Sequence, residues 1–384
     1  MTTPRRLLTI GHAYCVRRNR ELADAIAVAG GDAWSVTVVA PQRFPGDMGP
    51  IVTRAEPGER AELRLVPVHR ARWIHVMTYG RAVGGLLDAP WDLVHCWEEP
   101  YVLSTAQIAR SCHPDSKFVF ASFQNVDKRY PPPFSALERY AVGRSQGWIA
   151  FGQSIAETLE GRPGYAERPH AVIPFGVDVA RFTPDESARR EIRRTLNWDA
   201  DGAPVVGYLG RFIEAKGLVL LLDTLRQLDR RQVAWRALFV GGGPLEAQLR
   251  TFGDEHPGRV QVVTGVAHDE VSRYLRAMDV LCAPSRTTPG WREQFGRMIV
   301  EALACGVSVI GSDSGEIPHV IGDAGLVVKE DDRSAWTEAL ATLLTDPAAR
   351  RDFASRGRAR AEAEFAWPVV AARHLTFFER LLNT

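Results

Sequence analysis

The pattern that most constrains this chain is a repeated alternation of short apolar runs with stretches of helical period. The runs are rich in valine, leucine and isoleucine, and most end at glycine, proline, serine or aspartate. Continuous apolar strands joined by helices are typical of parallel sheets that are covered on both faces. Because the alternation occurs twice, the sequence predicts an α/β protein with two doubly wound, Rossmann-like domains. Expected strands include "SVTVVAP" and "KFVFAS" in the first half, and "RALFVGGG" and "VSVIGSD" in the second.

The segment "VIPFGVDVARFTP" interrupts this pattern near the middle of the chain, and its prolines and glycines mark the join between the domains. We therefore expect an N-terminal domain over residues 1–175 and a C-terminal domain over residues 176–365. Residues 366–384 carry aromatic and aliphatic side chains at helical spacing, which need a surface to pack on. We expect this last helix to cross back onto the N-terminal domain.

Composition and termini narrow the class of function. A net charge of +1 does not favour a nucleic acid as the partner. The five cysteines include no C-x-x-C pair, so neither a zinc site nor a disulfide framework is expected. The N-terminal residues lack a long apolar h-region, and no apolar run approaches the roughly 18 residues that span a bilayer. We expect a cytoplasmic protein, with peripheral contact at the inner face of a membrane left open. The segment "HRARWIH" mixes basic and aromatic residues as such surfaces do, but an exposed helix start is the favoured interpretation.

Two cations follow one strand of the second half. The stretch "YLGRFIEAKG" places Arg211 and Lys216 just after an expected strand and Gly210. In open parallel sheets ligands bind outside the carboxyl ends of the strands. Two cations at that edge can converge on a diphosphate as charge-assisted donors. The alternative is that both are solvated surface charges.

The stretch "EQFGRMIVEALACG" raises the question of what its two glutamates meet. Glu301 lies among apolar residues of an expected helix, and a buried carboxylate needs a partner. Eight residues of helix would rotate Glu293 away from Glu301 by roughly 80°, so Glu293 is better placed on the loop before the helix. The two hydroxyls of a ribose are a natural partner for Glu301. An ion pair with Arg297, four residues earlier, is the alternative.

These motifs together resemble glycosyltransferase family 4, retaining enzymes of the GT-B fold. The stretches "GRFIEAKG", "GGGPL", "TGVAHDEV", "DVLCAPS" and "EQFGRMIVEALACGVSVIGSDSGEIPHVIGDAGLVV" stand in the order and spacing of that family. The segment "VIPFGVDVARFTP" is similar to its interdomain segment. The resemblance is dense from about Val172 to Trp367 and covers the first half only in outline. It implies two domains that face each other across a cleft.

The resemblance also implies roles for individual residues. Arg211 and Lys216 would hold the donor diphosphate and support the leaving group. Glu301 would bind the ribose, and Glu293 would contact hydroxyls of the transferred sugar. No metal and no cofactor is implied, because the two cations and the helix N-terminus supply the positive field. Further donor contacts are implied for Gly11, Gly210, Val266, Phe295, Gly296 and Arg297.

The first half departs from the family pattern in two places. Many members have a Gly-Gly pair after the first strand, where "TIGHAYCVRRNREL" offers only Gly11 and then His12. Many also have a histidine where "FASFQNVDKRYPPP" has Gln124 or Asn125. Neither amide can act as a general base, so the leaving phosphate is expected to take the acceptor's proton. Candidates for the acceptor side are His12, Gln124, Asn125 and Glu98, although negative charge at a helix start explains Glu98 and Glu99 equally well.

The predicted function is transfer of a sugar, with retention and without metal, from a nucleotide diphosphate sugar to a hydroxyl acceptor. A UDP-sugar is the first donor expected and a GDP-sugar the second. The acceptor is a glycan, a lipid-linked molecule or a small molecule. Two alternatives stay open: a sugar-nucleotide epimerase of the same architecture, and a non-catalytic partner that binds nucleotide sugars.

Overall fold

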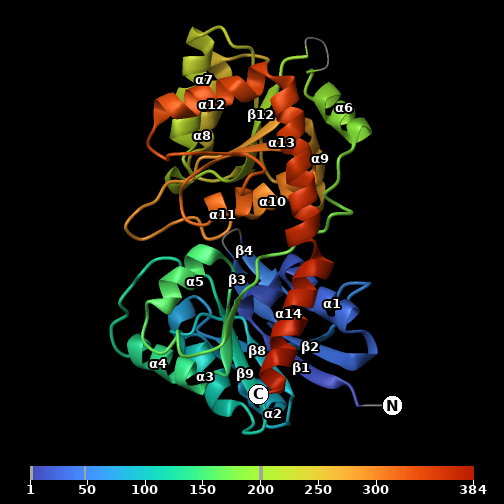
Figure 1. Cartoon of the computed structure of the whole chain (residues 1–384), viewed down its shortest axis with the longest axis vertical. Helices are drawn as coiled ribbons and strands as arrows, with labels where there is room; N and C mark the ends of the chain where they lie inside the picture. The colour runs from blue at the N-terminus through green and yellow to red at the C-terminus, as the bar shows by residue number, and fades with distance from the viewer. Residues whose placement is uncertain (1–2, 47–48, 199–201) are drawn as a thin grey trace. The chain divides into compact units, whose positions relative to one another are not determined.

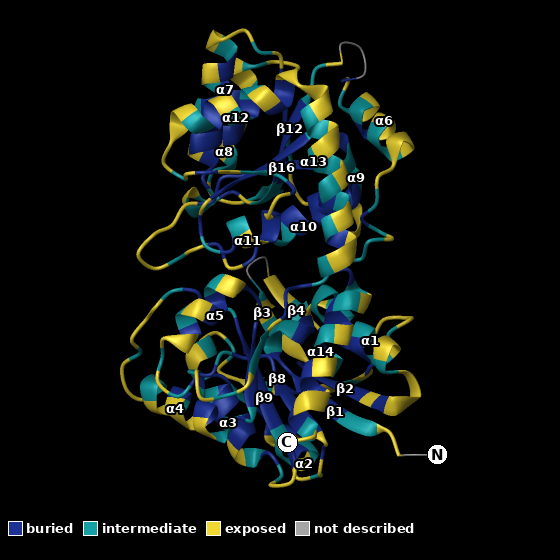
Figure 2. Cartoon of the chain, viewed as in Figure 1, coloured by how far each residue is buried: buried dark blue, intermediate teal, exposed yellow. Residues whose placement is uncertain are grey.

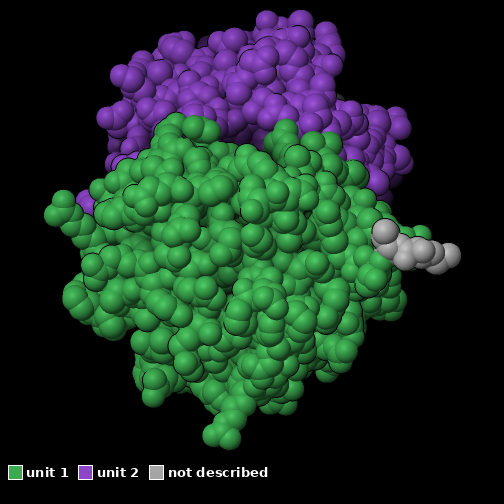
Figure 3. Space-filling model, turned by 60° about the horizontal axis from the view of Figure 1, so that its bottom comes forward, with its two compact units in different colours: residues 1–176, 367–384 green, residues 177–366 purple. Residues whose placement is uncertain are grey.

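The computed structural model describes residues 3–46, 49–198 and 202–384 (Figure 1). The chain divides into two compact units, Met1–Gly176 with Trp367–Thr384 and Val177–Ala366 (Figure 3). Each unit has its own sheet, whose strands are mostly buried between covering helices (Figure 2). We refer to them as unit 1 and unit 2. The chain thus passes between the units twice, after Gly176 and after Ala366.

Unit 1 contains a seven-stranded parallel sheet in the order β11-β10-β9-β8-β1-β2-β5. After β1 the chain adds β2 and β5 on one side, and then β8 and the later strands on the other. The order therefore reverses between β1 and β8, which is the topological switch point where such sheets bind ligands. The strands of this sheet are β1 (Arg5–Ile10), β2 (Trp34–Pro41), β5 (Glu62–Val66), β8 (Leu93–Cys96), β9 (Lys117–Ser122), β10 (Gly147–Ala150) and β11 (His170–Val172). Two small antiparallel ribbons also belong to unit 1. One pairs β3 (Arg43–Gly46) with β4 (Gly49–Val52), and the other pairs β6 (Val68–His69) with β7 (Thr78–Tyr79).

The last helix of the chain, α14 (Trp367–Leu382), belongs to unit 1 and packs beside α1 (Arg17–Gly30) (Figure 1). The indole nitrogen of Trp367 donates a hydrogen bond to Glu21 on α1 at 3.0 Å. Phe377 and Phe378 are buried, so α14 supplies the apolar cover that this side of the sheet requires. The other helices of unit 1 are α2 (Arg81–Leu87), α3 (Leu103–Ser111), α4 (Phe134–Arg144) and α5 (Gln153–Glu160).

Unit 2 contains a six-stranded parallel sheet in the order β14-β13-β12-β15-β16-β17, and its switch point lies between β12 and β15. Its core packs the leucines of α7 against two buried tryptophans, Trp235 and Trp336. The strands are β12 (Val205–Arg211), β13 (Arg236–Gly242), β14 (Val260–Val263), β15 (Val280–Ala283), β16 (Ser308–Ser312) and β17 (Leu326–Val328). The helices are α6 (Glu186–Thr195), α7 (Leu218–Arg230), α8 (Glu246–Glu255), α9 (Val271–Ala277), α10 (Arg297–Ala304), α11 (Ile317–Ile321), α12 (Arg333–Thr345) and α13 (Pro347–Arg360).

The glycine run after β13 meets a packing requirement. A Cβ on Gly241 would lie 1.8 Å from the carbonyl oxygen of Gly210, and one on Gly243 would lie 2.7 Å from that of Phe212. The ends of β12 and β13 can therefore approach this closely only because these positions carry no side chain.

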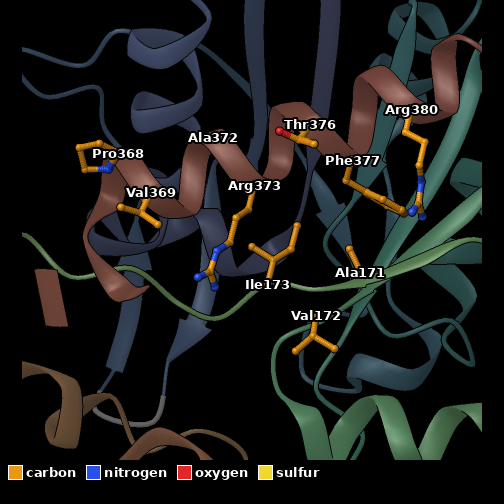
Figure 4. A pocket seen from close by; sticks show the side chains of 10 residues that line it. All are labelled: Ala171, Val172, Ile173, Pro368, Val369, Ala372, Arg373, Thr376, Phe377 and Arg380. Carbon is orange, nitrogen blue, oxygen red and sulfur yellow. The ribbon is translucent and has the colours of Figure 1, made fainter. Parts of the chain in front are cut away.

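A groove of about 620 Å³ lies within unit 1 between α14 and residues 171–173 (Figure 4). Its walls are mainly apolar, with Arg373 and Arg380 on the helix side. Arg380 donates a hydrogen bond to the carbonyl oxygen of His170 at 3.2 Å. None of the residues predicted to bind donor or acceptor lines this groove, and its lining holds no group suited to acid–base chemistry at neutral pH.

Within residues 3–46, 49–198 and 202–384, no helix has the length and apolar character needed to cross a membrane. The interpretation of His69–His75 as a helix start is wrong. That segment leaves β6 and enters a single 3-10 turn, η3 (Ile74–Val76), with Trp73 68% exposed.

Candidate functional site

At the switch point of unit 2 a lysine and a glutamate form an ion pair. Lys216 ends the 3-10 turn η4 (Glu214–Lys216), which follows β12, and Glu293 lies in the loop between β15 and α10. The Lys216 ammonium donates to Oε2 of Glu293, and the Ser285 hydroxyl donates to the same oxygen at 2.8 Å. The two charged side chains are only 12% and 8% exposed. A nearly buried charge pair therefore lies at the edge where ligands are expected.

Two glycines allow the loops that carry this pair to come together. Gly217 has a φ of 72°, and a Cβ there would lie 1.7 Å from the carbonyl oxygen of Pro284. Gly315, after β16, has a φ of 57°, and its Cβ would lie 2.1 Å from the carbonyl oxygen of Glu293. The next amide, that of Glu316, donates to the same Glu293 carbonyl at 3.0 Å. Loops from three strand ends thus hold Glu293 in place.

Arg211, the last residue of β12, presents an exposed side chain at the same strand end. Its guanidinium has no hydrogen bond or ion pair within the described part of the chain. The Tyr208 hydroxyl donates to its carbonyl oxygen at 2.8 Å, and burial, with a smaller effect from Glu293, raises the pKa of Tyr208 far above its ordinary value. The backbone of Arg211 is therefore fixed while its cation is left available for an anion.

The remaining predicted donor residues lie around α10 and after β14. Gly296 takes the left-handed conformation, with φ at 81°, directly before α10 begins at Arg297. Glu301 lies within this helix and is 4% exposed. Glu293 therefore lies on the loop and Glu301 on the helix, as their spacing predicted. Phe295 is buried, and Val266 is half-buried beyond the end of β14.

Sequence reasoning missed two side chains that touch the ion pair. Ser285 is the last residue of the stretch "DVLCAPS", in which strand β15 ends and a loop begins. This strand end was the signal in the sequence that could have pointed to Ser285. Trp291 has its ring 5.0 Å from the Lys216 ammonium, a cation–π contact that nothing in the spacing predicted. The described residues include no group of three or more histidine, cysteine, aspartate or glutamate side chains placed to hold a metal ion.

Unit 1 also places a histidine and a glutamate in contact at its switch point. Nδ1 of His12, which follows β1, lies 2.5 Å from Oε2 of Glu98, which follows β8. The backbone N–H of His12 and the hydroxyl of Tyr79 both donate to the other carboxylate oxygen at 2.6 Å. Burial lowers the pKa of His12, but the charge and hydrogen bond of Glu98 more than offset this, so its pKa is raised overall.

The two other acceptor-side candidates have different surroundings. Gln124 uses its amide nitrogen to donate to the carbonyl oxygen of Val126 at 2.6 Å. Asn125 is buried beside it.

The interpretation of Glu98 and Glu99 as charges at a helix start is wrong. The helix α3 begins only at Leu103 and has no acidic residue in its first turn. Glu99 instead accepts hydrogen bonds from the Ser122 hydroxyl at 2.6 Å and the Phe123 amide at 2.7 Å. Burial raises its pKa to about 7. Tyr79 and Ser122, which fix these carboxylates, come from distant parts of the sequence and gave no signal.

Comparisons with known proteins show which proteins this chain resembles. Residues 188–360 match the family described as glycosyl transferases group 1. The chain is 33% identical to a GDP-mannose-dependent monoacylated alpha-(1-6)-phosphatidylinositol monomannoside mannosyltransferase of Corynebacterium glutamicum. This match extends over 204 residues, which are 52% of the chain and 54% of that relative's length. Over 92% of the chain it is 26% identical to the lipopolysaccharide core biosynthesis mannosyltransferase LpsB of Rhizobium meliloti, of which it covers 99%.

Solved structures also have the fold of this chain. Sucrose-phosphate synthase from Thermosynechococcus elongatus superposes with a TM-score of 0.75 over 99% of both chains, at 22% sequence identity. The two doubly wound units therefore define a protein of the GT-B fold. Within that fold, residues 188–360 are similar to the group 1 glycosyl transferases. Both the predicted fold class and the resemblance are confirmed.

Proposed function

We propose that this chain transfers a sugar from a nucleotide diphosphate sugar to a hydroxyl acceptor, with retention of configuration and without a metal ion. The observation that carries the proposal is the arrangement at the β12/β15 switch point. There the Lys216–Glu293 pair lies beside the strand end that carries Arg211, whose guanidinium has no partner in the part of the chain that the structure describes. A diphosphate needs fixed positive charge, and a sugar needs a carboxylate that accepts from its hydroxyls.

In this proposal Arg211 and Lys216 bind the diphosphate, and Glu293 accepts hydrogen bonds from the sugar. The bond between the anomeric carbon and the diphosphate oxygen breaks, and the diphosphate leaves with the electron pair. The bond from the acceptor oxygen to the anomeric carbon forms on the same face. The two cations stabilise the charge that develops on the leaving group, which is the reason that no metal is required.

GDP-mannose is the first donor to test, because the Corynebacterium relative is named as GDP-mannose-dependent. UDP-sugars come second. The relatives' names include a phosphatidylinositol mannoside and a lipopolysaccharide core, so we infer a glycoconjugate acceptor and peripheral contact with a membrane.

The test is a thermal-shift screen of GDP-, UDP-, ADP- and TDP-sugars, followed by assay of transfer. A ligand at 100 times its dissociation constant stabilises the folded state by about 2.7 kcal/mol, which is readily measured. NMR of the product should show the donor's anomeric configuration, and EDTA should leave the rate unchanged. Arg250→Ala, on the surface of α8, is the matched control and should bind the donor normally.

Three outcomes would contradict parts of this proposal. Normal donor binding by a Lys216→Ala, Arg211→Ala double variant would remove the diphosphate site from this strand edge. Loss of activity in EDTA that magnesium or manganese restores would remove metal independence. Conversion of the donor without any acceptor would instead identify an epimerase.

A further inference from the structure

Residues 63–87 form a strongly basic stretch of unit 1. This stretch contains four arginines and no aspartate or glutamate, so its net charge is +4, whereas the whole chain has a net charge of +1. Three of the arginines, Arg70, Arg72 and Arg81, are exposed. None of the three forms an ion pair or a side-chain hydrogen bond within the part of the chain that the structure describes. Three cations on the surface of unit 1 are therefore available to a negatively charged partner.

An exposed tryptophan lies in the middle of this basic stretch. Trp73 is 68% exposed, which is the largest exposed fraction among the large apolar side chains of the described residues. Its neighbours His69, Arg70, Arg72 and His75 are exposed as well. An indole ring among cations is typical of surfaces that contact membranes, because the ring enters the layer of lipid headgroups while the cations bind lipid phosphates.

The backbone holds Trp73 in this exposed position. Residues 70–77 connect β6 to β7, and Arg70 has the left-handed conformation, with a φ of 57°. The N–H of Trp73 donates to the carbonyl oxygen of Arg70 at 2.9 Å, and the N–H of Val76 donates to that of Trp73 at 2.9 Å. Met77 is fully buried and anchors the end of the connection. A side chain with positive φ persists only where its surroundings fix it, so a defined turn presents the Trp73 ring to solvent.

We propose that residues 63–87 are the surface through which unit 1 contacts an anionic membrane, with Trp73 in the headgroup layer and Arg70 and Arg72 on lipid phosphates. The inference rests on the membrane contact in the proposed function and specifies the residues that make it. It involves unit 1 alone and requires no transfer of sugar.

The distribution of charge favours a membrane over a nucleic acid. Since the whole chain has a net charge of +1 and this stretch has +4, the rest of the chain has a net charge of −3. A long polyanion that extends beyond the stretch would be repelled by that charge. An anionic lipid surface can instead be met by the basic stretch alone.

The first test is cosedimentation of the full chain with vesicles, without any substrate. Vesicles of mixed phosphatidylglycerol and phosphatidylcholine should bind the wild type, and added salt should weaken this binding. Vesicles of phosphatidylcholine alone should bind it weakly. The double variant Arg70→Ala, Arg72→Ala should bind mixed vesicles about 30-fold more weakly, because each basic residue near an anionic surface contributes about fivefold. The matched control is Arg190→Ala, Arg194→Ala, which removes two exposed arginines of α6 and should bind as the wild type does.

The second test concerns the aromatic ring. Trp73→Ala should weaken vesicle binding by on the order of tenfold, because an inserted indole removes apolar surface from water. Trp73→Phe should keep most of the binding. Lipids with brominated acyl chains should quench part of the tryptophan fluorescence of the bound wild type but not that of bound Trp73→Phe, since bromine quenches on contact. Thermal unfolding of each variant should match that of the wild type, because the substituted side chains are exposed.

Several results would overturn the proposal. Wild-type vesicle binding by Arg70→Ala, Arg72→Ala or by Trp73→Ala would do so, and so would equal binding to the two kinds of vesicle. Binding of single-stranded RNA without binding of vesicles would assign the surface to a nucleic acid instead.

An assay with a soluble acceptor keeps this inference apart from the proposed function. With a nucleotide sugar as donor and methyl α-mannoside as acceptor, Trp73→Ala should transfer at the wild-type rate. If the wild type binds vesicles through Trp73 but transfers no sugar, the proposed function fails and this inference stands. If it transfers sugar but binds no anionic vesicles, this inference fails alone.

Discussion

Lys216 and Arg211 are both cations at one strand edge, but their surroundings differ. The Lys216 ammonium is nearly buried and bound to Glu293, whereas the Arg211 guanidinium is exposed. A buried charge pair contributes little net stability, yet removal of one member leaves the other charged and unpaired. The two residues should therefore respond differently to the same substitution.

Arg211→Ala should weaken donor binding and slow transfer, by on the order of 2–4 kcal/mol in transition-state stabilisation, and leave stability unchanged. Lys216→Ala should in addition lower the free energy of unfolding by on the order of 3 kcal/mol, because the nearly buried Glu293 carboxylate loses the cation of its ion pair. Urea unfolding and donor titration measure both effects. A Lys216→Met, Glu293→Gln double variant should regain much of the stability. Equal unfolding curves for the two single variants would contradict this assignment.

Experiments should also distinguish the role of Glu301 from that of Glu293. If Glu301 accepts the ribose hydroxyls, Glu301→Gln should lower nucleotide affinity by about 1.5–3 kcal/mol per charged hydrogen bond lost, with the fold intact. Glu293→Gln should lower turnover more than nucleotide binding, because its partner is the transferred sugar. Calorimetric titration with the free nucleotide, and with an analogue that lacks the ribose hydroxyls, tests both statements. Unchanged nucleotide affinity in a well-folded Glu301→Gln variant would contradict the ribose assignment and favour the alternative, in which Glu301 forms an ion pair in the core.

At the scale of elements, α14 meets the sheet of unit 1 through a pair of buried histidines. His374 on α14 and His95 on β8 are both fully buried, with ring centroids 6.2 Å apart. His95 Nδ1 lies 3.0 Å from the Thr9 hydroxyl, and His374 Nδ1 lies 2.9 Å from the carbonyl oxygen of Val370. Burial lowers the pKa of His95 to about 3 and that of His374 to about 4. Both rings are therefore neutral in the folded protein at neutral pH.

Mild acid should loosen the packing of α14. Because the folded-state pKa of each histidine lies below its unfolded value near 6.5, the neutral pair stabilises unit 1 above that pH, and this contribution is lost as the pH falls toward 4 and 3. For His374 the shift corresponds to about 3 kcal/mol. In His374→Leu the free energy of unfolding should fall less steeply between pH 6.5 and 4 than in wild type, as measured by urea unfolding. His69→Leu, at an exposed position, is the control, and parallel pH profiles for wild type and His374→Leu would contradict the prediction.

At the scale of the whole molecule, the chain passes between the units twice, after Gly176 and after Ala366. The residues that flank these two crossings lie close together within each unit. In unit 1 a Cβ on Gly176 would lie 2.1 Å from the Trp367 ring, and in unit 2 the Val177 amide donates to the carbonyl oxygen of Phe365 at 2.7 Å. Each unit can therefore be closed on itself by a short connection. Each unit could therefore be produced as a separate polypeptide.

A polypeptide of residues 177–366 should fold alone and bind the donor nucleotide, because its sheet, its core and every predicted donor residue except Gly11 are internal to it. Residues 1–176 alone should fail to fold, since α1 and Trp34 lose the cover of α14. Joining 1–176 to 367–384 through a short glycine linker should restore a folded unit 1. Circular dichroism and cooperative urea unfolding measure each case. A cooperatively folded 1–176 fragment would show that α14 is not needed.

The sequence by itself determined the two parallel sheets and which residues follow the strands of unit 2. Apolar strands with helical crossovers leave few other ways to cover both faces of a sheet, and residues such as Arg211 and Glu293 follow strands along the chain, so their placement is local. Only the tertiary structure decided how distant carboxylates are held. Glu98 lies 86 residues from His12 and 19 from Tyr79, and Glu293 lies 77 residues from Lys216. Strand order brings such residues together, and no spacing along the chain encodes strand order. For this reason the sequence left the acceptor cleft and a helix start as equal explanations of Glu98, whereas the structure pairs Glu98 with His12.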